Sequence, residues 1–453
     1  MKSQIKEINQ GTIWDKETIL ATVHEKNVLF VRLQFLDILG TPKNIVLPVA
    51  GLEDALDEGV PFDASSIAGY ATIEESDKIA KPDPASFVIL PESVEKRTTA
   101  KLNCDIYEPN GSRFDGDVKY ILEKMVEKIA KKGFIYNTGP ECEFFLFKKE
   151  GENSTCQPHD TAGYFDLSHR DLAEGVRADI SLALEDVGIQ PYTAHHEVAN
   201  GQQEINFHYA DAISTADRVI TLKYITKVIA TNHGLHASFM PKPMYGQCGS
   251  GMHTHQSLFT FDGKNAFYDA NDKNQLSPLA YHFIAGLLKY IKEICAVLNP
   301  TVNSYKRLVP GYEAPTYICW ANRNRSALIR IPSKRGKSTR CELRNPDVAC
   351  NPYLAFSVML AAGLRGIEDK LEAPDPVEKN IYHLTEDERR TFGIDQLPDS
   401  LGHALAVMSK SELVRATLGD HVFENFLHVK NEEWGAYRMQ VTRWEIDNYL
   451  PIL

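Results

Sequence analysis

The stretch GPECEFFLF, residues 139–147, places two carboxylates inside a run of apolar residues. Its aromatic content is typical of a β-strand that enters a core. Side chains at positions i and i+2 of a strand share a face, so Glu141 and Glu143 project together. Cys142 and Phe144 then face the other side. Because two unpaired buried carboxylates are costly, the pattern indicates either a strand with one wet face or a pair of acids neutralised by a divalent cation.

The length and composition limit the class of protein. A chain of 453 residues is too long for one ordinary core, which predicts two or more folding units. Hydrophobic content of 43% and charged content of 24% are typical of a soluble globular protein. The net charge of −12 argues against an extended basic surface for nucleic acid.

The same sequence predicts a cytoplasmic location and no membrane contact. No run of about 18 apolar residues is present, and the start of the chain lacks the apolar segment of a signal peptide. The eight cysteines form no C-x-x-C pair, which favours reduced thiols over disulfides or a zinc ribbon.

Alternation of apolar and polar residues predicts a strand-rich unit up to about residue 110. Strands are predicted at 28–35, in IVLPV, in FVILP and in TAKLNCDIY, after a polar segment that is helical near Lys16 to His24. The segment EPNGSRFDGD is the predicted boundary, because turn residues cluster there.

The remainder of the chain mixes helices with strands, which predicts an α+β protein. The segment 118–133 carries one apolar helical stripe and ends at Gly133. Further helices are predicted in 171–188, 215–234, 277–299 and 351–371, the last buried along much of its length. QEINFHYA and HQSLFTF are predicted strands.

A second pair of acids occurs in HHEVANGQQEINFHY, residues 195–209. Glu197 and Glu204 flank a predicted turn at Gly201, and Glu204, Asn206 and His208 are predicted to share a strand face. A solvated loop explains one such acid, but it does not explain the repetition of the pattern.

A glycine-rich segment, YGQCGSGMHTHQSLF, leads into His253 and His255, again two residues apart. Small residues allow a ligand to approach the backbone. A structural histidine is the more common explanation for either residue alone. The segment matches neither the P-loop pattern nor the dinucleotide fingerprint.

Cations are concentrated in SYKRLVPGYEAP, WANRNRSALIRIP and SKRGKSTRCELRNPD. Arginine is a planar, bidentate partner for carboxylate and phosphate, although a solvated charged face is the simpler alternative. Glu342 lies among these cations, two residues from Arg344. Five acids, histidines and many arginines without a P-loop together indicate phosphoryl transfer with a metal-held nucleotide.

Seven segments in family order resemble glutamine synthetase of the bacterial and archaeal type I, from about Val28 to the C-terminus. They are FDASSIAGY with EESD, GPECEFF, HHEVANGQQE, MPKPMYGQCGSGMH, NSYKRLVPGYEAP, NRSALIRIP and RCELRNPD. The resemblance, which favours the non-adenylylated alpha subgroup, implies an N-terminal helical segment (1–25), a β-grasp-like domain (26–110) and a catalytic domain (111–453) with a curved antiparallel sheet. It also implies a dodecamer of two hexameric rings, with active sites shared between neighbouring subunits.

The resemblance implies a role for each matching residue. Two or three Mg²⁺ or Mn²⁺ ions are expected in each site: Glu143, Glu197 and Glu204 would hold one ion, and Glu141, His253 and Glu342 another. The residues expected to bind glutamate are Gly249, Arg307, Glu313, Arg325 and Arg344. The nucleotide residues implied are Tyr209, His255, Ser257, Arg325, Arg330, Lys337 and Arg340. Asp63 of a neighbouring subunit would help to deprotonate ammonium, Glu313 would close the site, and Arg325 would also act in catalysis.

The implied reaction joins ammonium to L-glutamate, with ATP activating the γ-carboxylate as γ-glutamyl phosphate. Two alternatives remain: a γ-glutamylamide ligase that uses an organic amine, and a non-catalytic regulatory relative. Asp63 and Glu313 favour ammonium, and retention of all six metal ligands favours an enzyme. A metal-dependent hydrolase would not need the set of arginines. Regulatory protein partners are compatible with the resemblance.

Four positions depart from the family pattern. Cys248 replaces the usual Asn beside the glutamate contact, and a thiol is a weaker hydrogen-bond partner than an amide. Ala64 replaces a Gly after Asp63. Thr72 stands where many relatives have an Arg linked to glutamine feedback, so that control is expected to be absent. Tyr382 aligns with a tyrosine that is adenylylated in some relatives, but the residues around it differ, which predicts an unmodified side chain.

Overall fold

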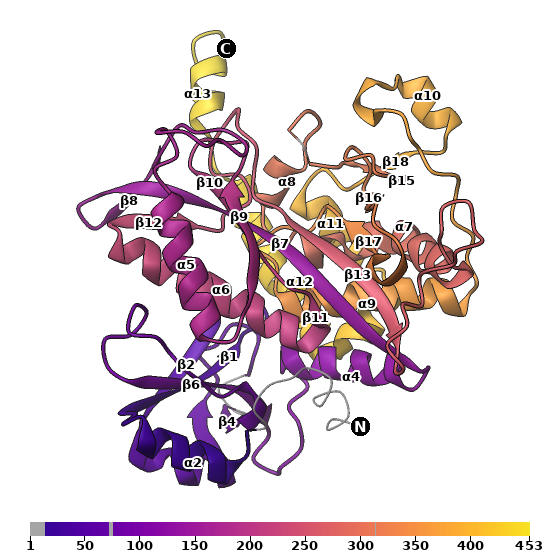
Figure 1. The fold of residues 1–453 in the computed structure, drawn as a ribbon. Helices are drawn as coiled ribbons and strands as arrows, with labels where there is room; N and C mark the ends of the chain where they lie inside the picture. The colour runs from indigo at the N-terminus through magenta and orange to yellow at the C-terminus, as the bar shows by residue number, and fades with distance from the viewer. Residues whose placement is uncertain (1–13, 72–75, 313) are drawn as a thin grey trace.

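The protein has an α+β architecture built on two main sheets, as a computed structural model shows for residues 14–71, 76–312 and 314–453 (Figure 1). The N-terminal sheet lies at the bottom of the view, and the large sheet runs through the centre. This arrangement agrees with the mixed class predicted from the sequence.

The N-terminal sheet has the strand order β2-β1-β6-β4-β3, with β5 paired to β6. The β1–β6 pair is parallel, and the other pairs are antiparallel. Its strands are β1 (Phe30–Leu36), β2 (Pro42–Pro48), β3 (Val60–Asp63), β4 (Asp77–Pro82), β5 (Val88–Ile89) and β6 (Thr99–Tyr107). The helical pieces are α2 (Lys16–Glu25), α3 (Leu52–Asp57), η1 (Val49–Gly51) and η3 (Pro84–Ser86). The predicted helix near Lys16 to His24 is confirmed, whereas only two residues of FVILP pair as a strand.

The large sheet follows the order β15-β16-β17-β13-β7-β10-β9, with β8, β11 and β12 also paired to β7. Its strands are β7 (Phe134–Glu150), β8 (Asn153–Pro158), β9 (Pro191–His196), β10 (Gln202–Phe207), β11 (Ala210–Asp211), β12 (Leu235–Ser238), β13 (Met252–Thr260), β15 (Trp320–Asn322), β16 (Ile329–Ile331) and β17 (Cys341–Leu343). Strand β7 contains the GPECEFFLF stretch, so the predicted strand is confirmed.

Helices cover one face of the large sheet and bury alternate residues of β7. Cys142, Phe144 and Leu146 belong to the main hydrophobic core with residues of α4 (Val118–Ala130), α6 (Ala212–Asn232), α7 (Pro278–Leu298) and α9 (Pro352–Glu368). The opposite face of β7 presents Glu141 and Glu143. This division confirms the alternation predicted from the sequence.

Helix α9 is nearly surrounded by protein, since 14 of its 17 residues are buried. It packs closely on α7, where a Cβ added at Gly286 would lie 2.2 Å from the carbonyl oxygen of Ala362. Burial on all sides explains why the segment is apolar along most of its length, and it confirms the predicted burial along much of the helix.

The remaining elements surround these layers. They are α5 (Glu174–Asp186), α8 (Ser304–Arg307), β14 (Tyr317–Ile318), η4 (Gly336–Ser338), η5 (Ile381–His383), α10 (Glu386–Thr391), β18 (Asp395–Gln396), α11 (Leu401–Met408), α12 (Glu412–Arg438) and α13 (Arg443–Tyr449). Among the described helices none has both the length and the apolar character of a membrane span. All eight cysteines have free thiols.

One sequence expectation about strand faces is wrong. Strand β10 ends at Phe207, where its pairing with β9 is irregular, so His208 does not continue the face of Glu204 and Asn206. His208 is exposed beyond the strand.

Candidate active site

The pairing of the strands brings the predicted metal ligands into one band across the large sheet. His253 on β13 pairs with Glu141 on β7, and Glu143 pairs with Glu204 on β10. Glu204 in turn pairs with His195 on β9. Paired residues share a face and have Cβ atoms about 4.5–5.5 Å apart, so the ladder gathers acids that lie far apart in the sequence.

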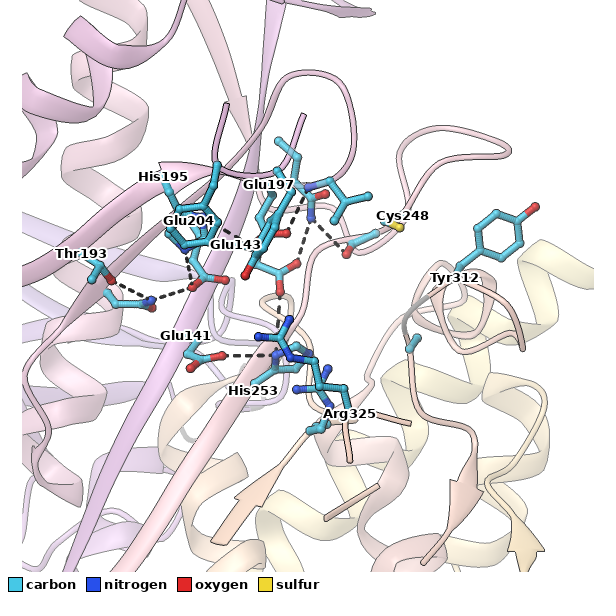
Figure 2. Close-up of a pocket in the computed structure, with 18 of the residues that line it drawn as sticks. Glu141, Glu143, Thr193, His195, Glu197, Glu204, Cys248, His253, Tyr312 and Arg325 are labelled. Atoms are coloured by element: carbon cyan, nitrogen blue, oxygen red, sulfur yellow. Dashed lines mark hydrogen bonds and ion pairs between the residues drawn. The ribbon is translucent and has the colours of Figure 1, made fainter. Parts of the chain in front are cut away.

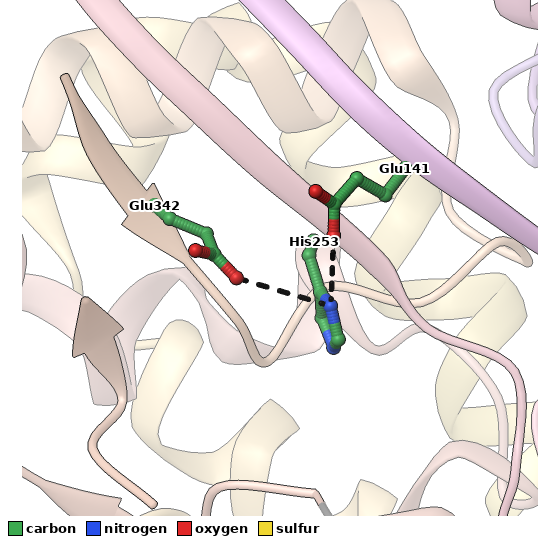
Figure 3. Close-up of side chains that lie close together, drawn as sticks. All are labelled: Glu141, His253 and Glu342. Carbon is green, nitrogen blue, oxygen red and sulfur yellow. Dashed lines mark hydrogen bonds and ion pairs between the residues drawn. The ribbon is translucent and has the colours of Figure 1, made fainter. Parts of the chain in front are cut away.

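Glu141, His253 and Glu342 form the first group, here called the strand cluster (Figure 3). One ligand atom from each lies within 4.8 Å of the others. His253 Nδ1 is 3.4 Å from Glu141 Oε2 and 4.0 Å from Glu342 Oε1. Burial and the Arg344 guanidinium lower the pKa of His253, which favours the neutral imidazole that binds metal. Two carboxylates and a neutral imidazole fit a hard divalent cation.

Two arginines compensate the charge of Glu342, which is fully buried. Arg330 Nε and Arg344 Nη1 each lie 2.5 Å from one of its carboxylate oxygens. Burial alone would raise the pKa of Glu342, but the charge of Arg344, together with His255 and Arg330, lowers this pKa overall. The carboxylate is therefore held in its charged form.

His255 lies beside the strand cluster and links it to Arg340. His255 Nε2 is 2.9 Å from Glu141 Oε1, and Arg340 Nε donates to His255 Nδ1 at 3.1 Å. Since Nδ1 accepts, Nε2 carries the proton and donates to Glu141. Burial would raise the pKa of Glu141, but hydrogen bonds from His253 and His255 hold it well below its usual range.

His195, Glu197 and Glu204 form the second group, here called the hairpin cluster, around the turn between β9 and β10. His195 Nε2 is 3.3 Å from Glu204 Oε1, and His195 Nδ1 is 3.6 Å from Glu197 Oε1. Asn206 Nδ2 donates to Glu204 Oε1 at 2.6 Å. These two acids are predicted to share an ion with Glu143, and the structure places His195 beside them as a further residue of ligand type.

Glu143 lies between the two clusters and lines the same pocket. Its Oε2 accepts from Gln202 Nε2 and from the backbone N–H of Gly251, both at 2.9 Å. Burial, together with the Glu204 carboxylate, raises the pKa of Glu143 to about 8. Such crowding of carboxylates is stabilised by a cation, so the residues present fit a second metal ion.

Arg307 and the glycine-rich loop pack tightly on the other side. Arg307 is buried, and its guanidinium donates to the carbonyl oxygens of Asn345 at 2.8 Å and Arg344 at 3.2 Å. A Cβ at Gly251 would lie 2.5 Å from Arg307 Nη2, and one at Gly249 would lie 2.2 Å from the carbonyl oxygen of Pro241. The glycines thus allow close packing of the chain itself, in addition to the ligand approach predicted from the sequence.

These groups surround a cavity of about 330 Å³ (Figure 2). The acids and His253 converge on it, Arg325 lies next to His253 in this view, and Tyr312 stands at its edge with the ring turned away from the acids. The predicted residues that line it are Glu141, Glu143, Glu197, Glu204, Gly249, His253, Arg307, Arg325, Arg330 and Arg344. Glu342 is not among the residues that line the cavity, but it lies beside His253 in the strand cluster (Figure 3).

Several predicted residues lie outside the lining of this cavity. Asp63 is exposed at the end of β3 in the N-terminal sheet, where it accepts from the backbone N–H of Ser65. Tyr209 and Lys337 are exposed, and Ser257 lies further along β13. Glu313 and Thr72 are outside the described residues.

Several residues that line the cavity have no role predicted from the sequence. They are Tyr164, Phe165, Tyr192, Thr193, His195, Val198, Gln202, Asn206, Tyr312 and Ala314. Cys248, which the sequence marks as a departure from the family pattern, also lines the cavity. Three of the residues without a predicted role, His195, Gln202 and Asn206, lie in segments already singled out for their acids. Their alternation with Glu197 and Glu204 was a usable signal, whereas the exposed aromatic loop at Tyr164 and Phe165 carried none.

A cavity on which carboxylates, histidines and arginines converge is typical of an enzyme that binds divalent cations next to anionic substrates. The family model for the catalytic domain of glutamine synthetase matches residues 115–449, and the model for its beta-grasp domain matches residues 27–109.

Several glutamine synthetases match nearly the whole chain. Those of Clostridium saccharobutylicum and Thermus thermophilus are each 52% identical, over 438 and 443 residues, covering 96% of this chain and 99% of theirs. The enzyme of Methanosarcina mazei is 50% identical over 439 residues, covering 97% of this chain and 98% of its own.

Solved structures of related proteins also align with nearly the whole chain. GmaS in complex with ADP aligns with a TM-score of 0.87 and 34% identity, over 95% of this chain and 99% of that one. Plasmodium falciparum glutamine synthetase, determined by cryo-EM, aligns with a TM-score of 0.86 and 25% identity, over 97% of this chain and 100% of that one. The chain belongs to the glutamine synthetase family. It is a glutamate–ammonia ligase that makes glutamine at the expense of ATP, and the family uses divalent metal.

Proposed function

We propose that the cavity holds two Mg²⁺ or Mn²⁺ ions at separate positions. Glu141, His253 and Glu342 would hold one ion, and Glu197 and Glu204 with Glu143 the other. The observation that supports this assignment is the ladder, which pairs Glu141 with His253 and Glu143 with Glu204. When bound, the ions would offset the charge of the polyphosphate and activate its γ-phosphate.

The arginines would bind the two anionic substrates. Arg307, Arg325 and Arg344 line the cavity, where they would bind glutamate with the backbone of Gly249. Arg325 would also stabilise the charge that develops during phosphoryl transfer. Their guanidinium groups would orient the γ-carboxylate of glutamate toward ATP, which gives γ-glutamyl phosphate.

The nucleotide would lie toward the far end of β13. Arg330 lines the cavity, and Arg340 is joined to the strand cluster through His255. Ser257, Lys337 and Tyr209 would complete this side. Their positions around β13 support a nucleotide that extends from the cavity along the sheet.

Ammonium would be deprotonated by the Asp63 carboxylate of a neighbouring copy, and Glu313 would close the site. Asp63 is exposed and is not among the residues that line the cavity of its own chain, which supports a site shared with a neighbouring copy in a dodecamer of two hexameric rings. A closed site protects the acyl phosphate from water.

Three finer features complete the proposal. The boundary between the two domains would lie near residue 110. Tyr382 would remain unmodified, because its hydroxyl already donates to the Ala314 carbonyl oxygen at 3.0 Å. A cytoplasmic location is supported by eight free thiols, among which Cys156 is exposed. Regulatory protein partners and the loss of glutamine feedback stay predictions from the sequence.

Phosphate release from ATP tests the proposed activity directly. With Mg²⁺ and glutamate present, ammonium should give turnover, whereas methylamine and a polyamine should give little. Turnover with an amine but not with ammonium would identify a γ-glutamylamide ligase. No turnover with any of them would support a non-catalytic relative.

Glu143→Ala tests the assignment of the ligands. Removal of this carboxylate should weaken Mn²⁺ binding and abolish most of the activity. Unchanged metal affinity and activity would show that Glu143 is not a ligand.

A further inference from the structure

Asp160 and His196 form a buried ion pair behind the hairpin cluster, and neither residue lines the cavity. Both side chains have no exposed surface, and His196 Nε2 lies 2.8 Å from Asp160 Oδ1. Asp160 lies in the loop between β8 and α5, and His196 is the last residue of β9. The pair therefore joins two segments that border the site.

The hydrogen-bond partners of His196 hold its ring from two sides. Nε2 faces a carboxylate oxygen, and Nδ1 lies 2.6 Å from the backbone carbonyl oxygen of Glu197. The ring therefore bridges Asp160 and the backbone of Glu197. Hydrogen bonds to a carboxylate are shorter and stronger than those between neutral groups.

Asp160 also closes the turn between β9 and β10. Its Oδ1 accepts from the backbone N–H of Gly201 at 3.0 Å, in addition to His196. Gly201 and His196 stand at opposite ends of the segment that contains Glu197. One carboxylate oxygen thus fixes the distance between the two ends of this turn.

Glu197 is consequently held through its backbone on both sides. Its carbonyl oxygen accepts from His196, and its N–H donates to the Gln202 carbonyl oxygen at 2.8 Å. The loop of Asp160 is attached a second time, where Phe165 donates its N–H to the His196 carbonyl oxygen at 3.2 Å and stacks its ring on His195. The side chain of Glu197 therefore projects into the cavity from a fixed backbone.

We propose that Asp160 and His196 are positioning residues that hold Glu197 in place for binding the second metal ion. The inference rests on the proposed role of Glu197 as a ligand. Neither side chain contacts the cavity, so they act only through the turn. Partners that orient a ligand in this way typically contribute about 10–100-fold to metal affinity.

Mn²⁺ binding to the intact protein without substrates tests the proposal. Asp160→Asn, which removes the charge at nearly constant shape, should weaken one class of Mn²⁺ site by about 10–100-fold. The site at the strand cluster should keep its affinity. If Asp160→Asn does not fold, His196→Gln takes its place, and the same loss of Mn²⁺ affinity at one class of site is expected.

Asp179→Asn is the matched control, because Asp179 pairs with His233 at the same 2.8 Å but on the surface. It should leave both classes of site unchanged. Unaltered binding in a folded Asp160 or His196 variant, or equal weakening of both classes, would overturn the proposal.

Glu197→Gln separates this proposal from the proposed function. If Glu197→Gln weakens one site and Asp160→Asn does not, the positioning role is wrong and the ligand assignment stands. If Glu197→Gln itself leaves binding unchanged, the ligand assignment is wrong.

Discussion

The strand cluster and the hairpin cluster present similar ligands but balance their charge differently. In the strand cluster, Glu342 is fully buried between Arg330 and Arg344. In the hairpin cluster, Glu204 contacts His195 and Asn206 and crowds Glu143, whose pKa is raised to about 8. The strand cluster is thus balanced by the protein, whereas the hairpin cluster depends more on a cation.

The comparison contrasts a carboxylate that is paired with arginines and a group of carboxylates that are crowded together. A buried charge must be compensated by other residues at all times, as Glu342 is by Arg330 and Arg344. Crowded carboxylates such as Glu143 and Glu204 can be compensated by an ion that binds and leaves. Stability should therefore be sensitive at the strand cluster, and metal affinity at the hairpin cluster.

The largest effect on stability is expected for Glu342→Ala. It leaves the buried Arg344 and the partly buried Arg330 without their carboxylate, which should cost about 3–5 kcal/mol of unfolding free energy. Denaturant unfolding of the metal-free protein measures it. Glu368→Ala, which removes a surface carboxylate paired with Lys132 at 3.1 Å, is the control and should change little. A small effect at Glu342 would remove the distinction between the clusters.

Glu197→Gln should mainly weaken metal binding rather than lower the stability of the protein. Mn²⁺ affinity at the hairpin cluster should fall by at least about 100-fold, the upper range for a residue that only orients a ligand. The unfolding free energy without metal should stay the same or rise, because one of the crowded carboxylates loses its charge. Isothermal titration with Mn²⁺ and denaturant unfolding give the two values. A marked loss of metal-free stability would contradict the account.

Gly251→Ala should have an intermediate effect on stability and substrate binding. Gly251 donates its backbone N–H to Glu143, between the two clusters. The added methyl group would meet Arg307 Nη2 at 2.5 Å and His253 Nε2 at 3.0 Å. Overpacking of this kind costs about 1–3 kcal/mol and should raise the KM for glutamate. Gly175→Ala is the control, because nothing lies within 4 Å of its added Cβ. An unchanged KM for Gly251→Ala would show that the side chains around Gly251 can accommodate the added methyl group, which would contradict their tight packing.

The smallest effect is expected for Cys248→Asn, which introduces the residue usual in the family. Cys248 lines the cavity beside Gly249. An amide can add a hydrogen bond to bound glutamate, worth about 0.5–1.5 kcal/mol. The KM for glutamate should therefore fall by about two- to tenfold. An increase in KM would mean that the thiol already suits the pocket.

The sequence predicted which side chains share a face of a strand better than it predicted which strands pair. Glu141 and Glu143 alternate with core residues, so their common side could be predicted from period two alone. The strand order that brings Glu342 next to His253 depends on pairing between segments about 90 residues apart. No local pattern specifies such pairing, and the ligand groups came only from the resemblance.

The limits of the sequence are clearest at the hairpin cluster. His195 alternates with Glu197 in HHEVANGQQE, which was a signal for a shared face, but no local pattern indicated that it pairs with Glu204 on the next strand. The loop with Tyr164 and Phe165 has no periodicity that would direct it to the cavity. Its place depends on contacts with the turn, such as the hydrogen bond from Phe165 to His196.

The central claim, that Glu141 and Glu143 serve different ions, is tested most directly by Mn²⁺ binding isotherms. Glu141→Gln and Glu143→Gln should each lose one site and retain the other, and the double variant should lose both. If the double variant binds Mn²⁺ as either single variant does, the two carboxylates share one ion and the account is wrong.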